Sequence, residues 1–158
     1  MIDHDNAAFI QTGIAISLAS CGADRVPNNV RALGCKLVDG GQRVAIFVRA
    51  SQARAVVANI AENGRVAAVF SLPSSNRTLQ LKGSDAQTSA FDTTDLTLTE
   101  RHTEAFLCEV LPEGVSEIAV RTIHAYSPAD LTVIVFTPTA AFSQTPGPRA
   151  GQAIVGAA

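Results

Sequence analysis

The sequence predicts a mainly β protein with helices (α+β), built as an antiparallel barrel or a strongly curled sheet with helices packed outside. The prediction rests first on the order of elements, β-β-β-α-β-β-α-(α)-β, in which neighbouring strands are joined by hairpins. It rests second on the small number of helices, because a doubly wound sheet needs a crossover helix between nearly all of its strands. The 158 residues are enough for one domain with its own hydrophobic core.

The first three strands are predicted from apolar alternation and from turn residues. Residues 13–20 (GIAISLAS) alternate apolar and small side chains, which is typical of a strand with one buried face. Residues 21–29 contain Gly, Asp, Pro and two Asn and therefore indicate a loop. Two further strands span residues 30–38 and 43–49. The Asp39-Gly40-Gly41 segment between them suits a tight hairpin, because Gly tolerates positive φ.

A helix and a second strand pair follow. Ser51 is the predicted helix N-cap, and Gly64 is the predicted stop. The apolar positions between them share one helical face: Ala53, Val56, Val57 and Ile60. Residues 65–72 and 78–82 are then predicted strands, joined by a Pro-Ser-Ser-Asn turn.

The next segment is acidic and helical. Residues 85–117 contain eight acidic side chains and one base, Arg101. Thr97 and Glu100 have the spacing of a capping box, and Pro112 ends the predicted helix. Its apolar face consists of Thr103, Phe106, Leu107 and Val110. We interpret the acidic side chains as the solvated face of this helix.

We treat residues 1–158 as one domain with three parts. A basic ligand-binding core spans about 13–83, and a helical segment that includes a shorter helix at 116–123 spans about 93–123. The last strand, at 131–137, and the tail occupy residues 130–158.

The Pro/Gly-rich tail at residues 144–151 (QTPGPRAG) is flanked by apolar residues. Phe142 precedes it, and Ile154 and Val155 follow it. Two prolines fix φ and two glycines permit close backbone approach, so the segment suits a defined turn. We expect the tail to be ordered against the barrel or a partner subunit.

Residues 25–82, here called the basic module, carry most of the positive charge. They hold nine of the twelve Lys and Arg residues and two carboxylates, Asp39 and Glu62, which gives about +7 in a chain of net charge −2. A basic segment within a mildly acidic protein indicates a small anionic ligand held against the sheet. A phosphomonoester fits this pattern, because Arg forks bind phosphate through charge-assisted hydrogen bonds.

Composition suggests the context of the protein. Apolar residues make up 47% of the chain and charged residues 16%, so we expect apolar surface to be buried in a homodimer. No apolar run approaches the roughly 18 to 20 residues of a membrane span. The N-terminus is acidic where a signal peptide would be basic, which favours a cytoplasmic protein. Cys21, Cys35 and Cys108 are then expected to be reduced core thiols.

Several common sites are not supported by motifs. The chain has no Gly-x-Gly-x-x-Gly after a strand, no Walker-type loop and no Gly-x-Ser-x-Gly elbow. His4, His102 and His124 are far apart in sequence and lack metal-ligand spacing, so no metal site is predicted. With no Trp, one Tyr (Tyr126) and a negative net charge, the chain is a poor candidate for binding nucleic acid.

From Val30 to Gly83 the chain resembles the pyridoxamine 5′-phosphate oxidase-like family of FMN-binding split-barrel flavoproteins. Arg31 and Lys36 have that family's Arg-x-x-x-x-Lys spacing on a strand, ahead of a hairpin. The resemblance implies that Phe47 and Val48 form the strand end that lies along the flavin.

The rest of the resemblance lies at the helix start and in the following strand pair. Arg54 matches the Lys that reaches the flavin phosphate, and residues 77–83 (RTLQLKG) resemble an Arg-Gln-x-x-x-x-Gly strand. Ala53 and Thr78 stand where the family has Arg and often Gln, and the oxidase's C-terminal Trp and Arg segment is missing. The resemblance therefore implies FMN binding rather than oxidation of pyridoxamine 5′-phosphate.

Together these observations predict an FMN site and leave two functions open. The predicted cofactor-binding residues are Arg31, Lys36, Phe47, Val48, Ser51, Arg54, Thr78 and Gln80. No side chain is assigned as a catalytic acid or base. The first function is an FMN-binding, oxidoreductase-like protein that acts on a small molecule. The second is a non-catalytic binding module of the same fold that has lost FMN or binds heme or a deazaflavin.

Overall fold

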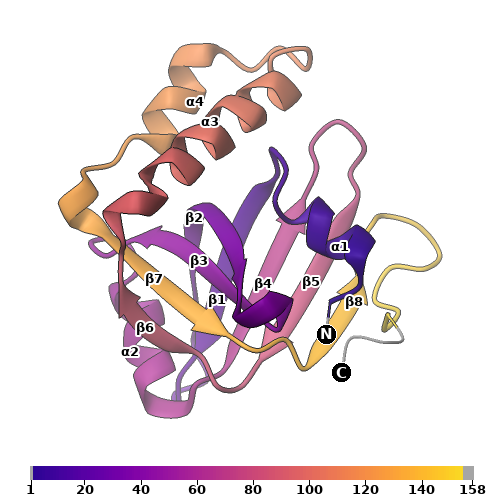
Figure 1. Ribbon diagram of the computed structural model, residues 1–158. Coiled ribbons are helices and arrows are strands. Elements are labelled where there is room, and N and C mark those ends of the chain that lie inside the picture. The colour runs from indigo at the N-terminus through magenta and orange to yellow at the C-terminus, as the bar shows by residue number, and fades with distance from the viewer. Residues whose placement is uncertain (1, 155–158) are drawn as a thin grey trace.

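The computed structural model describes residues 2–154 and shows one strongly curled antiparallel sheet with helices outside it (Figure 1). Its eight strands follow the order β6-β7-β3-β2-β1-β4-β5-β8, and the two edge strands leave the sheet open rather than closed. The predicted α+β architecture of hairpin-connected strands is confirmed.

The elements have the following bounds. The strands are β1 (Ala15–Cys21), β2 (Pro27–Val38), β3 (Arg43–Arg49), β4 (Val66–Ser71), β5 (Thr78–Gly83), β6 (Gln87–Ala90), β7 (Leu131–Phe136) and β8 (Ala140–Ser143). The helices are α1 (His4–Phe9), α2 (Arg54–Asn63), α3 (Leu96–Val110) and α4 (Glu117–His124). Three short 3₁₀ turns are η1 (Asp39–Gly41), η2 (Thr93–Asp95) and η3 (Pro128–Asp130).

Two strands and one helix were absent from the sequence prediction. β6 consists of four exposed residues, QTSA, and β8 consists of AAFS, so neither shows the apolar alternation on which the prediction depended. Each becomes a strand by pairing with a longer neighbour, β6 with β7 and β8 with β5. α1 is only six residues long, and Asp3 caps it by accepting a hydrogen bond from the Asn6 amide.

Two predicted helix starts are wrong. α2 begins at Arg54 with Ala53 at the N-cap position and no side-chain cap, so Ser51 is not its cap. α3 begins at Leu96, which places Thr97 inside the helix rather than at a capping box. The predicted stop of α2 is confirmed, because Gly64 adopts the left-handed conformation with φ +67.

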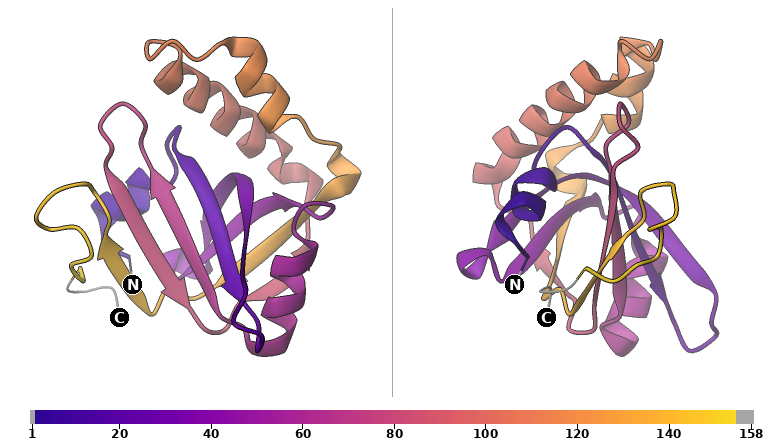
Figure 2. Two further views of the ribbon diagram at one scale, coloured as in Figure 1. Left: turned by 180° about the vertical axis from the view of Figure 1, so that it is seen from behind. Right: turned by 90° about the vertical axis from the view of Figure 1, so that its right-hand side faces the viewer.

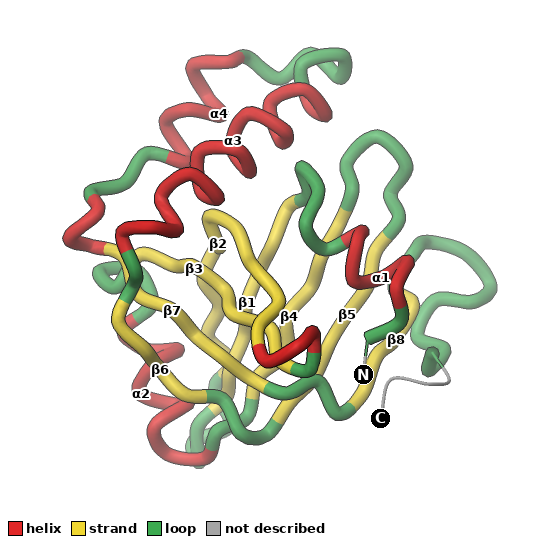
Figure 3. The backbone as a smooth tube through the Cα atoms, in the orientation of Figure 1, coloured by secondary structure: helices red, strands yellow, loops and turns green. Residues whose placement is uncertain are grey.

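The helices cover the sheet unevenly. Figure 2 shows α3 and α4 side by side near one end of the strands, with α2 at the other end. The interior of the curled sheet is filled by large buried side chains: Ile14, Ile16, Leu18, Ile46, Phe70, Leu81, Ile134 and Phe136. α3 packs on the outside of the sheet against β2. The tube in Figure 3 shows the same arrangement, with the strands in yellow and the α3–α4 pair in red near one end of them.

Close contact between α3 and the chain before β1 depends on Gly13. A Cβ at this position would lie 2.3 Å from the carbonyl carbon of Ala105 and 2.6 Å from the backbone nitrogen of Phe106. Only a residue without a side chain lets the helix backbone approach this closely. Gly13 therefore helps to fix α3 on the sheet.

A β-bulge in β2 rearranges the basic module. The pairing of β2 with β3 shifts by one residue between Ala32 and Cys35. Gly34 lies within this bulge with φ +144, a conformation that L side chains rarely adopt. The extra residue brings Arg31 and Lys36, five positions apart, onto the same face, whereas strict alternation would put them on opposite faces.

The tail is ordered against the barrel, as expected, as far as residue 154. Residues 152–154 fold back on β8, with a bridge between Phe142 and Ala153. The Gln144 amide also donates to the Thr78 carbonyl at 2.8 Å. Val155, the second predicted anchor after the tail, lies outside the described residues.

Two predictions from composition can be compared with the structure. All three cysteines are free, but Cys108 is exposed on α3, so the prediction of a core thiol is wrong there, and Cys21 and Cys35 are only partly buried. Exposure of Cys108 follows from its place on the solvent side of α3, opposite the buried face. Among residues 2–154, no helix is long and apolar enough to cross a bilayer.

Candidate functional site

The site begins with two arginines on neighbouring strands. Ala32 pairs with Val48, so the residues next to them, Arg31 on β2 and Arg49 at the end of β3, face each other. Like charges opposite each other destabilise a sheet unless an anion or another partner compensates. Burial lowers the pKa of Arg49, the Asp130 charge opposes this effect, and the Arg31 charge lowers the pKa further. This pair is the centre of positive charge in the basic module.

Arg49 is committed to the protein itself. Its side chain is buried, with the residue only 8% exposed. Its Nε donates to the Ala125 carbonyl at 2.7 Å, Nη1 donates to Gln52 Oε1 at 2.8 Å, and Nη2 donates to the Ile123 carbonyl. Carbonyls at a helix C-terminus favour a cation, so Arg49 fixes the end of α4 over the end of β3.

Asp130 fixes the same corner from the opposite direction. Its Oδ1 accepts from the Ser51 amide at 2.8 Å and its Oδ2 accepts from the Ser51 hydroxyl at 2.5 Å. The Asp130 carbonyl also accepts from the Ala50 amide at 2.6 Å. The Ser51 hydrogen bonds lower the pKa of Asp130, and the charges of Arg49 and Arg54 lower it further. Ser51 therefore binds the chain's own carboxylate.

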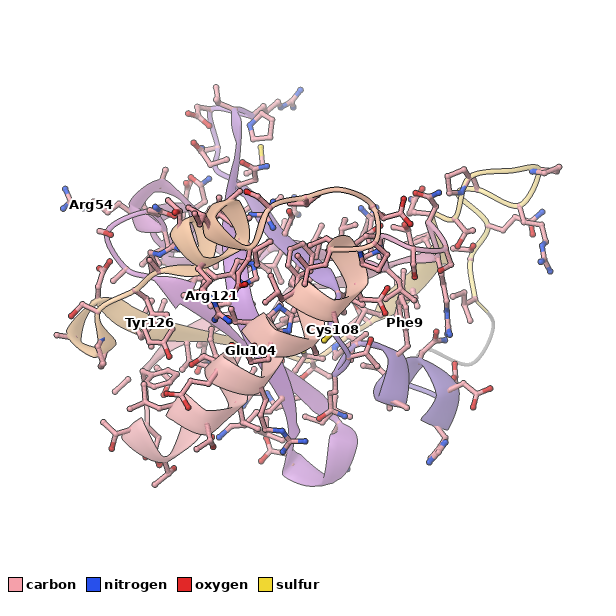
Figure 4. All side chains as sticks on the ribbon, turned by 90° about the horizontal axis from the view of Figure 1, so that it is seen from above. Phe9, Arg54, Glu104, Cys108, Arg121 and Tyr126 are labelled. Atoms are coloured by element: carbon pink, nitrogen blue, oxygen red, sulfur yellow. The ribbon has the colours of Figure 1, made fainter. Side chains whose placement is uncertain are left out.

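A cleft of about 630 Å³ opens beside this corner. Its lining consists of Arg31, Arg49, Gln52, Thr122, Ile123, Ala125, Tyr126, Ser127 and Asp130. Tyr126 is fixed to α3, because its hydroxyl lies 2.6 Å from Thr99 Oγ1. Figure 4 shows Tyr126 beside α3 and the end of α4. The cleft thus combines cations, one carboxylate and an aromatic wall.

Arg31 and Arg54 are the cations available to a ligand here. Both are exposed, and within residues 2–154 neither side chain makes a hydrogen bond or an ion pair. Arg31 lines the cleft. Arg54 extends away from the body of the fold in Figure 4, although its charge reaches Asp130. Of the eight predicted residues, Arg31, Ser51 and Arg54 are therefore brought to one corner.

Lys36 is not part of this corner. Its Nζ lies 2.5 Å from Asp95 Oδ2, and Asp95 is buried. Lys36 pairs with Ala45 on β3, four residues before Arg49. The expected use of Arg31 and Lys36 on one phosphate is therefore not seen within this chain. Asp95 also corrects the interpretation of the acidic segment as solvated throughout, because a buried partner for Lys36 was not foreseen.

Phe47 and Val48 are both fully buried. Phe47 faces α3 and packs edge-on against Phe91, with ring centroids 5.3 Å apart. Val48 points into the interior of the curled sheet. Their predicted place along a flavin stays a prediction.

Thr78 and Gln80 lie on β5, in the other half of the sheet. The Thr78 amide donates to Thr145 Oγ1 at 2.9 Å, and Gln144 Nε2 donates to Gln80 Oε1 at 3.3 Å. A smaller pocket of about 310 Å³ adjoins Thr78. Within one chain these residues do not join the cleft beside Arg31.

A buried histidine pair lies behind the cleft. His102 and His124 stack with ring centroids 5.9 Å apart, and His124 Nδ1 lies 3.2 Å from Thr103 Oγ1. Burial lowers the pKa of both histidines to about 4, and the positive charge of Arg31 contributes to each shift. Both rings are therefore neutral at pH 7. Sequence distance concealed this pair, which forms only when α4 packs beside α3.

Of the residues that line the cleft, sequence reasoning found only Arg31 and missed the other eight, among them Arg49, Tyr126 and Asp130. Arg49 was missed because the predicted hairpin register, with Val38 opposite Arg43, would place Ala50 opposite Arg31. Only the β-bulge moves Arg49 to that place. For Asp130 no local signal exists, because its partner Ser51 is 79 residues away in sequence.

The chain is similar in structure to several solved proteins. No family model matches the chain, and no curated protein matches it. Among solved structures, an F420 reductase matches with a TM-score of 0.58 and 17% identity, covering 89% of this chain and 98% of its own. A putative pyridoxamine 5′-phosphate oxidase from Lactobacillus delbrueckii matches with a TM-score of 0.53 and 12% identity, covering 89% and 93%. This chain has the pyridoxamine 5′-phosphate oxidase-like split-barrel fold.

A third structure extends the likeness over almost the whole chain. HupZ from Group A Streptococcus matches with a TM-score of 0.56 and 15% identity, covering 96% of this chain and all of that one. This likeness is not confined to the sheet, because a match over 96% of the chain takes in residues of the helical pair α3 and α4. The fold predicted from the resemblance is confirmed.

Proposed function

We propose that this split-barrel protein binds FMN in the cleft beside Arg31 and Arg49 and supports redox chemistry on a small molecule. The observation that carries the proposal is the facing pair of guanidinium groups. One of them, Arg31, is exposed in the cleft and has no side-chain partner among residues 2–154. The similarity of the fold to a putative pyridoxamine 5′-phosphate oxidase supports a flavin as the ligand.

The residues present fit a flavin with a phosphate. Arg31 supplies a fork of donors for phosphate oxygens, and Arg54 adds positive charge from the start of α2. Ile123, Ala125 and Tyr126 supply an apolar wall against which a planar ring can pack. A bound flavin supplies the electron transfer, and these side chains supply binding and orientation. No described side chain is assigned as a proton donor or acceptor in the reaction.

A second candidate ligand is a deazaflavin. It is supported by the similarity to an F420 reductase, whose TM-score of 0.58 is above that of the putative oxidase. Such a ligand also carries phosphate, so the same arginines would serve it. A non-catalytic module of this fold is the alternative from a different functional class, and heme is a further ligand to test for.

The visible spectrum of the purified protein is the first test. FMN gives a band near 450 nm, a deazaflavin absorbs at shorter wavelength, and heme gives a Soret band. Mass spectrometry of the released ligand then identifies it. If the protein is colourless and FMN, added at micromolar concentration, does not bind, the FMN proposal is wrong.

The second test places the phosphate. Arg31→Ala should weaken FMN binding by roughly 1.5 to 3 kcal/mol, the scale of a charged hydrogen bond. Arg65→Ala is the matched control, since Arg65 is an exposed arginine of the basic module outside the cleft lining. Equal FMN affinity in both variants would contradict the assignment of Arg31.

A further inference from the structure

The lining of the cleft contains one acidic residue, Asp130, which lies beside the chain segment that leads into α2. Asp130 lines the cleft and binds the amide and hydroxyl of Ser51 at 2.8 and 2.5 Å. Ser51 lies three residues before α2, a ten-residue helix that has no side-chain cap. The amides at a helix start and the helix dipole favour an anion. Asp130 places a negative charge close to this helix start, since the Arg54 charge helps to lower its pKa.

We propose that Asp130 determines which ligand charge the cleft accepts. Its carboxylate takes the position beside Ser51 that a ligand phosphate would otherwise take, and it repels a phosphate placed nearby. The proposal rests on the proposed function, because the phosphate concerned is that of the flavin. It makes Asp130 a specificity-determining residue.

The charges around Asp130 support this assignment. Arg49 uses three of its five N–H donors on Ile123, Ala125 and Gln52, so it has fewer donors left for a phosphate than Arg31 has. Its charge is also opposed by the nearby Asp130 carboxylate. Arg31 is left as the anion anchor that faces the cleft. A phosphate must therefore bind on the Arg31 side, at a distance from Ser51.

The test compares FMN with riboflavin, which differs from it by the phosphate alone. Affinities of both flavins are measured for the wild-type protein and for Asp130→Asn, which keeps an oxygen to accept from Ser51. We expect the preference for FMN over riboflavin to rise on the order of tenfold in the variant, with riboflavin affinity nearly unchanged. Because the chain has no Trp and a single Tyr in the cleft, Tyr126 fluorescence reports occupancy.

Asp85→Asn is the matched control. Asp85 Oδ1 also accepts a backbone hydrogen bond, from the Thr137 amide at 2.8 Å, but Asp85 does not line this cleft. Its removal should leave the preference for FMN unchanged. If Asp130→Asn does not fold, Asp130→Ser removes the same charge and keeps an acceptor oxygen.

The outcomes separate the two proposals. A preference for FMN that stays within twofold of wild type in the Asp130 variant overturns the role of Asp130, while leaving flavin binding intact. If neither flavin binds any variant, the proposed function fails, and inorganic phosphate becomes the probe. Asp130→Asn should then gain more thermal stabilisation from millimolar phosphate than wild type or Asp85→Asn does. Equal stabilisation of all three proteins overturns the proposal.

Discussion

Gly13→Ala is expected to destabilise the protein more than any other glycine-to-alanine change at a non-positive φ. The added Cβ would lie 2.3 Å from both the carbonyl carbon and the carbonyl oxygen of Ala105. Ordinary contacts of a Cβ begin at about 3.4 Å, so α3 or the chain before β1 must move by about 1 Å. No side-chain rotation can relieve the overlap, because the atoms belong to the helix backbone.

The expected cost follows from this overlap. Overpacking in a buried site costs about 1 to 3 kcal/mol, and we expect the upper end because backbone must shift. For a chain of this length, 1 kcal/mol corresponds to roughly 2 to 4 °C in Tm. The Tm of Gly13→Ala should therefore fall by about 6 to 12 °C. Thermal unfolding followed by far-UV circular dichroism measures it, with urea denaturation as the second measurement.

Gly22→Ala is the control for this prediction. A Cβ at Gly22 would also meet atoms at 2.8 and 2.9 Å, but these are the ends of the Asn59 and Glu62 side chains, which can rotate away. The control should lose little stability. If both variants lose the same amount, close packing of α3 on Gly13 is not the cause, and the reasoning fails.

Three further predictions concern charge and assembly. Lys36→Met should lower the free energy of unfolding, measured in urea, by about 1 to 3 kcal/mol, because it leaves the buried Asp95 carboxylate unpaired. The control is Arg121→Ala, which removes an exposed ion pair, and an equal loss in both variants would contradict this prediction. Because the pKa values of His102 and His124 fall from about 6.5 to about 4, stability should be full above pH 6.5 and decline as the pH falls toward 4, and His102→Leu should flatten this decline. We also propose a homodimer, for which sedimentation should give about twice the 16.4 kDa chain mass, and a stable monomer at micromolar concentration would refute it.

Local sequence signals predicted most of the sheet, because they depend on neighbours. The strand at residues 43–49 has the predicted bounds, and the hairpin at residues 39–41 uses Gly40 with φ +66 as expected. Gly64 ends α2 for the same local reason. β6 and β8 could not be predicted this way, since exposed or small residues become strands only when a partner edge is present.

The candidate site was predicted less well, because it depends on register and on distant contacts. The family spacing of Arg31 and Lys36 was correct as a pattern, and the bulge at Gly34 does put both on one face. The two side chains nevertheless do different things: Arg31 lines the cleft, whereas Lys36 forms an ion pair with Asp95 of the acidic segment. Ser51 was assigned to a helix cap from its residue type, and only the fold shows that Asp130 binds it.

The hydrogen bonds that Arg49 and Asp130 make have a consequence for when the cleft forms during folding. They join Arg49 to Ala125 and Ile123, and Asp130 to Ser51, over 76, 74 and 79 positions in sequence. Contacts of such long range form after local hairpins, because the intervening chain must first be ordered. The cleft is therefore a late product of folding that exists only once β7 has paired with β3. A refolding chain should regain its sheet circular dichroism before it regains ligand binding.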